Sequence, residues 1–433
     1  MTMADLSTET TVRTQRKEDK GKADTYIIGI FITLCIFSII ESYSASSREI
    51  YLSGNIYTPM IKHLILLGGA ALILWAVQRI DYTRLLIPSI LFAIVTVILM
   101  VFTMFFGDVI NGAQRSFSVA GFTIQPAELA KIAIVFVLSF FLAQNLHKKE
   151  ISNKGLIWCV ATVSGFGFLL LLQGLTNTIL FMAISAAMLV IGGTKGRKLM
   201  KVIGIYVVIG FLFFGIKHVR DENRLEELTT TEQTEENTRL RDETWSKRLS
   251  DYFSELLGSE PYNNPSILEN DQKLYSYLAQ ANGGIIGEGP GGSRETSRLP
   301  LAFSDYVFSI VTEDLGLIGA LFLMGIYLCL LIRAGNIARR CNRAYPAFLV
   351  MGMAVMIVLQ AFFHMAINTG VFPVSGQNLP LISKGGTSIL VIGLAFGVML
   401  SVSRSAAQKG VKTNNQEKEA LPESIRAANP TRE

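Results

Sequence analysis

About ten blocks of apolar residues, each close to the length that crosses a lipid bilayer, constrain this chain more than any other feature of its sequence. A transmembrane helix needs about 20 predominantly apolar residues. The blocks fall at roughly 25–42, 60–79, 84–106, 126–146, 155–172, 175–193, 199–217, 305–332, 345–368 and 384–403. The fifth and sixth are almost continuous near Gln173 and Gly174, so nine spans are the alternative count. The pattern predicts an all-α, polytopic membrane protein.

The distribution of Lys and Arg favours ten spans over nine. With ten, every basic cluster falls on one side of the membrane, whereas nine would spoil the alternation. These clusters lie within 13–22, 79–84, 148–154, 195–201, 333–343 and 404–409. Because cytoplasmic loops carry an excess of positive charge, that side is expected to be the cytoplasm, with both termini there. The net charge of +5 therefore indicates membrane orientation rather than a nucleic-acid partner.

The spans divide the chain into five parts. We expect a cytoplasmic tail over 1–24, helices over 25–217, an extracytoplasmic loop over 218–304, helices over 305–404 and a cytoplasmic tail over 405–433. The large loop follows the seventh span, and its first half is interpreted as amphipathic surface helices between Asp221 and Glu260. Long ordered loops are more often functional than decorative. No cysteine falls in an expected outer loop, so neither a disulfide framework nor a zinc cluster is expected.

Two adjoining segments at the outer mouth of the fourth span carry charge. One contains Arg115, and the other runs from Gln125 to Lys131 and includes Glu128. Glu128 and Lys131 are three residues apart and so share one face of a helix. Charges buried at such depth usually face a cavity. The alternative is a Glu–Lys pair that only locks two helices together.

A glycine-rich stretch from Asn282 to Arg294 precedes the eighth span. Its members Gly287 and Gly289, followed by Ser293, permit tight turns in which successive N–H groups form an anion-binding nest. The plain alternative is that the stretch is only a loop. It lacks a Gly-Lys-Ser/Thr sequence and follows no strand, so it is not a nucleotide P-loop.

Ser304 and Asp305 open the eighth span. Taken alone they are best explained by capping, because a serine accepts from the first turn and an acid complements the helix dipole. Glu313 and Asp314 lie two to three turns deeper, where capping does not explain them. Acids at that depth indicate a polar interior.

The outer end of the tenth span, from Pro373 to Ser388, contains two prolines and paired glycines. This composition predicts a broken or re-entrant helix start, which is tolerated where protein or a cavity covers it. Lys384 within it either faces an anionic ligand or extends to the membrane interface. His364, inside the ninth span, is interpreted as structural.

Five segments together are similar to the SEDS family of shape, elongation, division and sporulation proteins. They read NGAQR (111–115), QPAELAK (125–131), GGIIGEG (283–289), SDYVF with EDLG (304–308 and 313–316) and PVSGQNLPLISKGGTS (373–388). The match covers roughly 25–404 in the expected order, and the ten-span count agrees. Thr387 favours the division branch over the rod-elongation branch.

The chain departs from the family pattern at two places. Ser116 and Phe117 stand where the family usually has a tryptophan after its loop arginine. The family's Pro-Asp pair at the start of the sixth span is missing from 173–178, where only Thr178 remains. The role of that acid must then be dispensable or supplied by another residue.

The resemblance implies a peptidoglycan glycosyltransferase that polymerises lipid II on the outer face of the cytoplasmic membrane. Asp305 matches the acid regarded as catalytic in the family, so we assign it the general-base role. Arg115, Lys131 and Lys384 are candidates for binding the pyrophosphate, with the glycine nest and Ser304 assisting. Glu128 would hold Lys131 or help to bind a divalent cation, Mg²⁺ or Mn²⁺, although no metal-ligand set is evident.

Partners and alternatives follow from the same resemblance. The family typically works with a class B penicillin-binding protein, a transpeptidase, and with other division proteins. A lipid-precursor flippase or transporter would also have many spans with buried charges, but it predicts internal repeats, which the sequence lacks. A non-catalytic division scaffold is the other alternative, and it predicts that Asp305 is replaceable.

Overall fold

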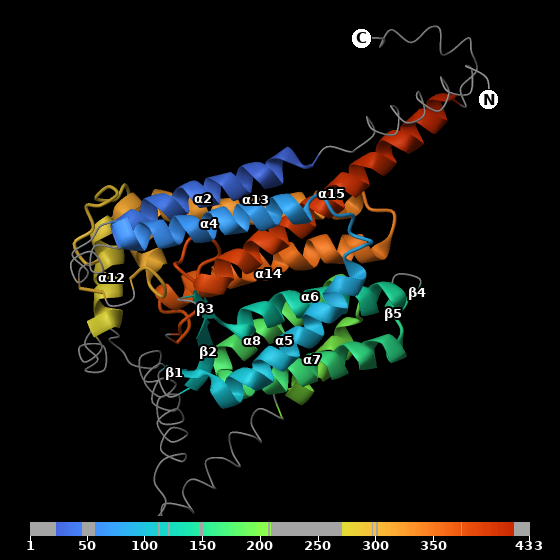
Figure 1. Cartoon of the computed structure of the whole chain (residues 1–433), viewed down its shortest axis with the longest axis horizontal. Coiled ribbons are helices and arrows are strands. Elements are labelled where there is room, and N and C mark those ends of the chain that lie inside the picture. The colour runs from blue at the N-terminus through green and yellow to red at the C-terminus, as the bar shows by residue number, and fades with distance from the viewer. Residues whose placement is uncertain are drawn as a thin grey trace, which may run out of the picture.

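The computed structural model describes residues 23–45, 57–110, 113–119, 122–147, 150–206, 208, 271–296, 298–299, 302–373 and 375–419. Over these residues the chain is a helical bundle (Figure 1). Its helices are α2 (Thr25–Ala45), α4 (Tyr57–Val77), α5 (Leu86–Phe106), α6 (Pro126–Gln144), α7 (Asn153–Gln173), α8 (Leu175–Ile191), α12 (Asp271–Gly283), α13 (Val307–Arg339), α14 (Ala344–Asn368) and α15 (Gly386–Glu419). The all-α polytopic architecture is confirmed.

Eight of these helices are long and apolar enough to cross a membrane, and α8 is a shorter apolar helix. Nine of the ten expected spans therefore appear as helices close to their predicted positions. The seventh, expected over 199–217, is helical over 196–206, and most of the rest lies outside the described residues. The amphipathic helices expected between Asp221 and Glu260 also lie outside them, so the five-part division stays a prediction.

The centre of the bundle is formed by α6, α14 and α15. In the apolar stretch of each of these helices, 72%, 72% and 78% of the residues are buried. The peripheral helices α2, α4 and α5 expose large apolar side chains, as a lipid-facing surface requires. Two glycines lie where α15 packs against α4. A Cβ atom on Gly393 of α15 would lie 2.6 Å from the Ala70 carbonyl oxygen of α4, and one on Gly397 would lie 2.9 Å from Val77. Small residues at this spacing let the two helix backbones approach.

A small antiparallel sheet connects α5 to α6, and the sequence analysis did not predict it. Its strands β1 (Asp108–Ile110), β2 (Ala113–Val119) and β3 (Phe122–Ile124) pair in chain order, with Phe117 opposite Ile124. A second hairpin, β4 (Leu146–His147) with β5 (Glu150–Ile151), joins α6 to α7. The larger sheet leads directly into Pro126, the first residue of α6, and so fixes where that helix starts.

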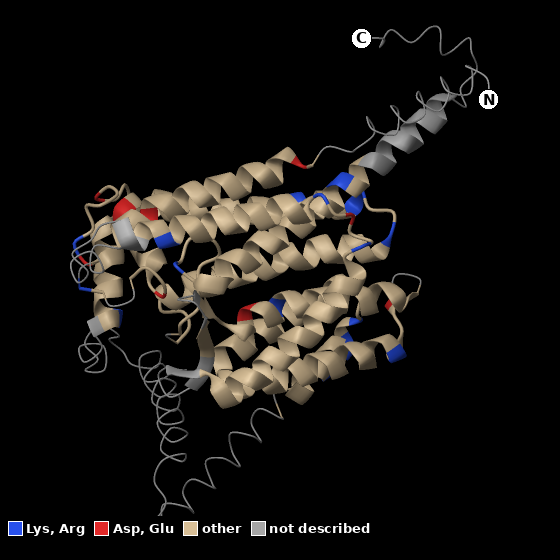
Figure 2. Ribbon diagram, viewed as in Figure 1, with Lys and Arg blue, Asp and Glu red and all other residues tan. Residues whose placement is uncertain are grey.

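The two ends of the bundle differ in charge (Figure 2). Lys and Arg gather where α2 begins and α15 leaves the bundle, whereas the opposite end, beside α12, carries both acidic and basic residues. At the basic end, Arg333 donates to both carboxylate oxygens of Asp24 over 2.6–3.0 Å and so ties α13 to the start of α2.

The expected start of the eighth span is corrected by the structure. The helix α13 begins at Val307, and its N-cap is Tyr306, which makes no side-chain capping bond. Ser304 and Asp305 lie in the turn before the helix, so Ser304 is not its N-cap. The reason is tertiary, because donors from α14 and from the segment after it hold the carbonyls of this turn.

The helix α13 is broken at Gly316, which has φ 65° and ψ −168°. In a regular helix the N–H groups of Leu317 and the residue after it would donate to carbonyls four residues earlier. Here Leu317 N donates to Gly284 O over 3.0 Å and Ile318 N to Ile285 O over 3.2 Å. In return, the N–H groups of residues 288 and 289 donate to the carbonyls of residues 313 and 314 over 2.9 Å. The glycine-rich segment thus replaces the hydrogen bonds that the break removes.

Candidate active site

Three segments that are far apart in the sequence meet around the turn before α13. The backbone N–H of Lys384 donates to Phe303 O over 2.9 Å, and the Ser383 hydroxyl donates to Ser304 O over 2.8 Å. From α14, the Asn368 amide donates to Asp305 O over 3.0 Å. Each carbonyl of this turn is therefore held by a donor from another element, which fixes the backbone that carries Asp305.

The carboxylate of Asp305 lies next to the backbone of Gly376, in the segment between α14 and α15. A Cβ atom built on Gly376 would lie 3.3 Å from Asp305 Oδ2. Asp305 is partly exposed, unlike the buried acids deeper in α13. Gly376 itself is exposed, so the carboxylate lies beside a stretch of backbone that the surface reaches and that carries no side chain.

Lys384 lies on the other side of the same turn. Its ammonium is 4.8 Å from the centre of the Phe303 ring, a cation–π distance. The Lys384 side chain is partly exposed, and the ring belongs to the residue two positions before Asp305. The structure therefore brings Ser304, Asp305 and Lys384 together, as the sequence analysis expected.

The Glu128–Lys131 pair is buried among three helices. Lys131 Nζ is 2.7 Å from Glu128 Oε1, and both side chains are under 5% exposed. The ammonium also donates to Gln360 Oε1 of α14 over 2.9 Å, while the Ser388 hydroxyl of α15 donates to Glu128 Oε2 over 3.1 Å. The predicted shared face of the helix is confirmed. The pair joins α6 to α14 and α15, so it also performs the helix-locking task that was the alternative.

The start of α15 connects this pair to the sheet. Gln125 N donates to the Thr387 hydroxyl over 3.2 Å, and a Cβ atom on Gly386 would lie 2.7 Å from Thr123 O of β3. Arg115, expected to bind an anion, lies on the neighbouring strand β2. The outer-loop segments around residues 115 and 125 and the paired glycines therefore occupy one region.

The glycine-rich segment lies elsewhere, around the break in α13. A Cβ atom on Gly287, whose φ is +91°, would lie 2.3 Å from Asp314 O. The Ser293 hydroxyl donates to the buried Glu313 carboxylate, which also accepts from Arg294 N over 2.9 Å. The N–H groups of Glu288 and Gly289 donate to carbonyls of α13, and those of Arg294 and Glu295 donate to the Glu313 carboxylate. In this structure these N–H groups hold α13.

The segment that lacks the family's Pro-Asp pair reaches the site through Asn177. Gln377 Nε2 donates to Asn177 Oδ1 over 2.7 Å, which joins the start of α8 to the segment between α14 and α15. Gln173 turns away instead and donates to Met100 O of α5 over 3.0 Å. Asn177 is thus the residue at this junction that contacts the candidate site.

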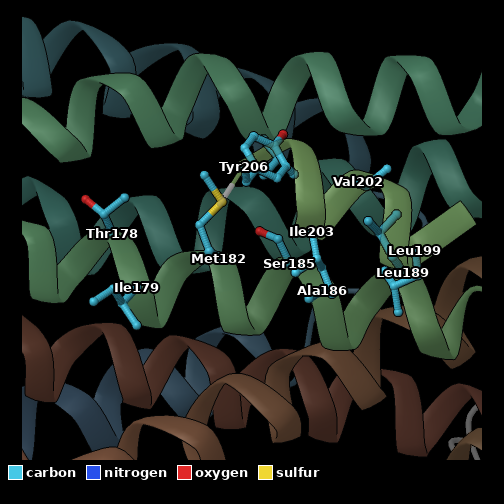
Figure 3. Close-up of a pocket in the computed structure, with 11 residues that line it drawn as sticks. Thr178, Ile179, Met182, Ser185, Ala186, Leu189, Leu199, Val202, Ile203 and Tyr206 are labelled. Atoms are coloured by element: carbon cyan, nitrogen blue, oxygen red, sulfur yellow. The ribbon is translucent and has the colours of Figure 1, made fainter. Parts of the chain in front are cut away.

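A cavity of about 290 Å³ lies apart from these residues, between α7, α8 and the helical residues 196–206 (Figure 3). Its lining is apolar apart from a few hydroxyls. Those of Thr178 and Ser185 donate to carbonyls of their own helix, and that of Tyr206 is paired with Ser164. None of the expected site residues lines it, so this cavity is not the candidate active site.

Sequence reasoning missed several residues that complete the site. Gln360, His364 and Asn368 lie four residues apart on α14 and contact either the Lys131 ammonium or the Asp305 backbone, directly or through each other. Polar residues repeated at this spacing within an apolar span are a signal that periodicity analysis finds. No such pattern in the sequence indicates Gly376, because its role depends on a contact with Asp305, which lies 71 positions earlier (376 less 305).

The helices form a membrane-spanning bundle. At one end of it, a partly exposed carboxylate lies beside a lysine, on backbone that other helices hold. Together these features define a polytopic membrane protein with an enzyme-like site. The sequence profile of the FtsW, RodA and SpoVE family, described as cell cycle proteins, matches residues 24–408. The chain belongs to this family.

Individual relatives cover nearly the whole chain. The probable peptidoglycan glycosyltransferase FtsW of Geobacter metallireducens is 29% identical over 387 residues, which are 88% of this chain and 94% of the relative. The FtsW protein of Enterococcus hirae, named in the same way, is 26% identical over 417 residues, covering 92% and 96%.

Two solved structures share the fold. The crystal structure of the rod shape determining protein RodA of Thermus thermophilus has a TM-score of 0.58 at 21% identity and covers 89% of this chain and 97% of its own. The other structure is described as “Structural coordination of polymerization and crosslinking by a peptidoglycan synthase complex”. One of its chains has a TM-score of 0.63 at 20% identity, and the match covers 89% of this chain and 98% of that one.

Proposed function

We propose that this chain is a peptidoglycan glycosyltransferase of the division type, which polymerises lipid II into glycan strands. The names of its relatives support this activity. The observation that carries the proposal is the placement of Asp305: its backbone is held by Asn368, and its partly exposed side chain lies beside Gly376. A positioned but accessible carboxylate is what a general base requires.

In the reaction, a sugar hydroxyl of one lipid II molecule attacks the anomeric carbon of another, and the lipid pyrophosphate leaves. Asp305 takes the proton of the attacking hydroxyl. The leaving pyrophosphate needs positive charge, for which Lys384 is the partly exposed candidate beside Asp305 and Arg115 the candidate on β2. Lys131 is buried at 2% exposure, so its charge acts on the site from within the protein, where Glu128 holds it.

Among the residues that the structure describes, no group of three or more His, Cys, Asp and Glu side chains converges on one point. A divalent cation held by one or two carboxylates together with the substrate pyrophosphate needs no such group. The steps proposed here use the protein's own carboxylate and cations.

We further propose that the active site lies on the outer face of the cytoplasmic membrane, with both termini in the cytoplasm. The basic end of the bundle, where α2 begins, supports this orientation by the positive-inside rule (Figure 2). The turn carrying Asp305 lies at the far end of α13 from Arg333 and Arg339. A class B penicillin-binding protein and other division proteins are the proposed partners, and the loop over 218–304 is a natural contact surface for them.

The test is polymerisation of purified lipid II by the purified full-length chain, alone and with its cognate class B penicillin-binding protein. Wild-type protein is expected to give glycan polymer, and Asp305→Ala and Asp305→Asn to give none. Asp81→Asn is the matched control, because this exposed acid lies in the turn after α4 at the basic end. Equal polymer from wild type and both Asp305 variants would refute the general-base assignment. Absence of polymer from every protein would favour the transporter or scaffold function.

A further inference from the structure

A row of three polar side chains runs along one face of α14, at Gln360, His364 and Asn368. Their spacing of four residues places them on the same side of the helix. They are 0%, 1% and 1% exposed, within the most enclosed part of the bundle. A polar group buried in this way destabilises the protein unless it is hydrogen-bonded, and each of the three is bonded to a different part of the candidate site.

At the outer end of the row, Asn368 holds the backbone of the catalytic acid. Its Nδ2 donates to Asp305 O over 3.0 Å and to His364 O over 3.0 Å, while its Oδ1 accepts from the Ser309 hydroxyl over 3.0 Å. Because backbone carbonyls only accept, these bonds fix which side of the amide faces Asp305. Asn368 thereby ties the turn before α13 to α14.

In the middle of the row, His364 connects Asn368 to the segment that follows α14. Its Nδ1 is 2.6 Å from Gln377 O, and since a carbonyl only accepts, Nδ1 carries the proton. Nε2 lies 3.3 Å from Asn368 Nδ2, a longer contact than the two 3.0 Å bonds that this amide nitrogen donates to the carbonyls of residues 305 and 364. His364 therefore holds the Gln377 carbonyl and lies against Asn368.

At the inner end, Gln360 holds the cation. Its Oε1 accepts from Lys131 Nζ over 2.9 Å, and its Nε2 donates to Asn378 O over 3.0 Å. Gln360 and Asn368 are eight residues apart, which at 1.5 Å per residue is about 12 Å along the helix. The row therefore contacts Lys131 at one end, Asp305 at the other, and two successive residues of the Gln377–Asn378 segment between them.

We propose that Gln360, His364 and Asn368 are positioning residues for glycosyl transfer, with α14 acting as a rigid spacer that sets Asp305 and Lys131 relative to each other. This inference rests on the proposed function. A helix is suited to this task because the distance between two positions on it is fixed. That distance matters, since misplacing a reacting group by 1 Å lowers the reaction rate by about a hundredfold.

Kinetics of lipid II polymerisation separate positioning from simple stabilisation. Asn368→Ala is expected to lower kcat at least tenfold with KM within twofold, because it frees the backbone of the base. Gln360→Ala is expected to raise KM for lipid II at least threefold, because it loosens the cation. Thr369→Val is the matched control: this hydroxyl donates to carbonyls of its own helix, and both constants are expected to stay within twofold of wild type.

His364 supplies a rescue test that does not depend on the Asn368 variant folding. In His364→Asn the side-chain amide can still donate to Gln377 O, as Nδ1–H does, whereas in His364→Leu it cannot. The asparagine variant is expected to keep at least a third of the wild-type kcat and the leucine variant less than a tenth, with melting temperatures of the two within a few degrees.

The outcomes distinguish this inference from the proposed function. Wild-type polymerisation with unchanged constants in Asn368→Ala and Gln360→Ala would overturn the inference and leave the proposed function standing. So would losses that follow melting temperature alone, or equal kcat in the two His364 variants. Absence of polymer from wild type, while a known polymerase is active on the same lipid II, would overturn both.

Discussion

Replacing Lys131 with methionine removes the positive member of a buried ion pair and leaves Glu128 buried without its cation. Lys131 Nζ makes two charge-assisted hydrogen bonds, 2.7 Å to Glu128 and 2.9 Å to Gln360. Each bond to a charged group contributes about 1.5–3 kcal/mol, which gives about 3–6 kcal/mol for two. Removing one partner of a buried pair costs about 3–5 kcal/mol by direct comparison. Lys131→Met is therefore expected to lower the free energy of unfolding by about 4 kcal/mol.

The double variant Glu128→Gln with Lys131→Met tests the cause of that loss. It removes both charges and leaves an amide that can still accept from Ser388, as Glu128 does. Buried ion pairs replaced by neutral groups of similar volume are often close to neutral in stability. The double variant is expected to unfold within about 1 kcal/mol of wild type, so the coupling between the two sites is about 3 kcal/mol or more.

The free energy of unfolding can be measured by titrating detergent-solubilised protein with sodium dodecyl sulfate and following helix content by circular dichroism. Polymerisation of lipid II is assayed on the same proteins, which are wild type, the two single variants Glu128→Gln and Lys131→Met, and the double variant. Recovery of stability without recovery of activity would show that the charge of Lys131 serves the reaction as well as the fold. A loss below about 1 kcal/mol in Lys131→Met, the range of an exposed pair, would refute the reasoning, because the pair would then not be desolvated.

Two glycine substitutions give further predictions. Gly376→Ala places a methyl group 3.3 Å from Asp305 Oδ2. The rate of lipid II polymerisation is expected to fall about tenfold, or about 1.4 kcal/mol in activation free energy, because the methyl group crowds the carboxylate, while the melting temperature changes little. An unchanged rate would contradict the close contact assigned to this position. Gly287→Ala and Gly289→Ala form a matched pair, because both glycines have φ near +90°. They differ in the space available: the methyl group of Gly287→Ala would lie 2.3 Å from Asp314 O, whereas that of Gly289→Ala would meet no backbone. Strain alone costs about 1–2 kcal/mol, so Gly289→Ala is expected to lose about that much free energy of unfolding and Gly287→Ala clearly more; equal losses would refute the close contact.

The spans were predictable because bilayer thickness sets their length independently of tertiary contacts. The Glu128–Lys131 pair was predictable for a similar reason, since spacing of three on a helix brings side chains together without reference to the rest of the chain. The sheet β1–β3 was missed because its outer strands are only three residues long, too short to show the alternation that identifies strands.

The remaining errors come from contacts between segments distant in sequence. Ser304 was interpreted as a helix cap from local pattern, but Ser383 binds its carbonyl and the helix begins later. The glycines around Gly287 were interpreted as an anion nest, because composition shows that a segment can turn tightly and does not show what its N–H groups contact. Their partner is the break at Gly316, which lies 29 residues further along the chain (316 less 287).

The break in α13 also explains how the turn that carries Asp305 can be rigid next to a helix that faces lipid. Residues 307–315 form a short helical segment between Asp305 and Gly316, and this segment is fixed from the protein side. Its Ser309 contacts Ser276 of α12 over 2.7 Å, and its Glu313 carboxylate accepts from the segment after Gly289. Beyond Gly316, the helix continues with its exposed apolar face. Because backbone hydrogen bonds at the break run to the glycine-rich segment, bending of the lipid-facing part need not move Asp305, whose turn is held by α14 and by the segment after it.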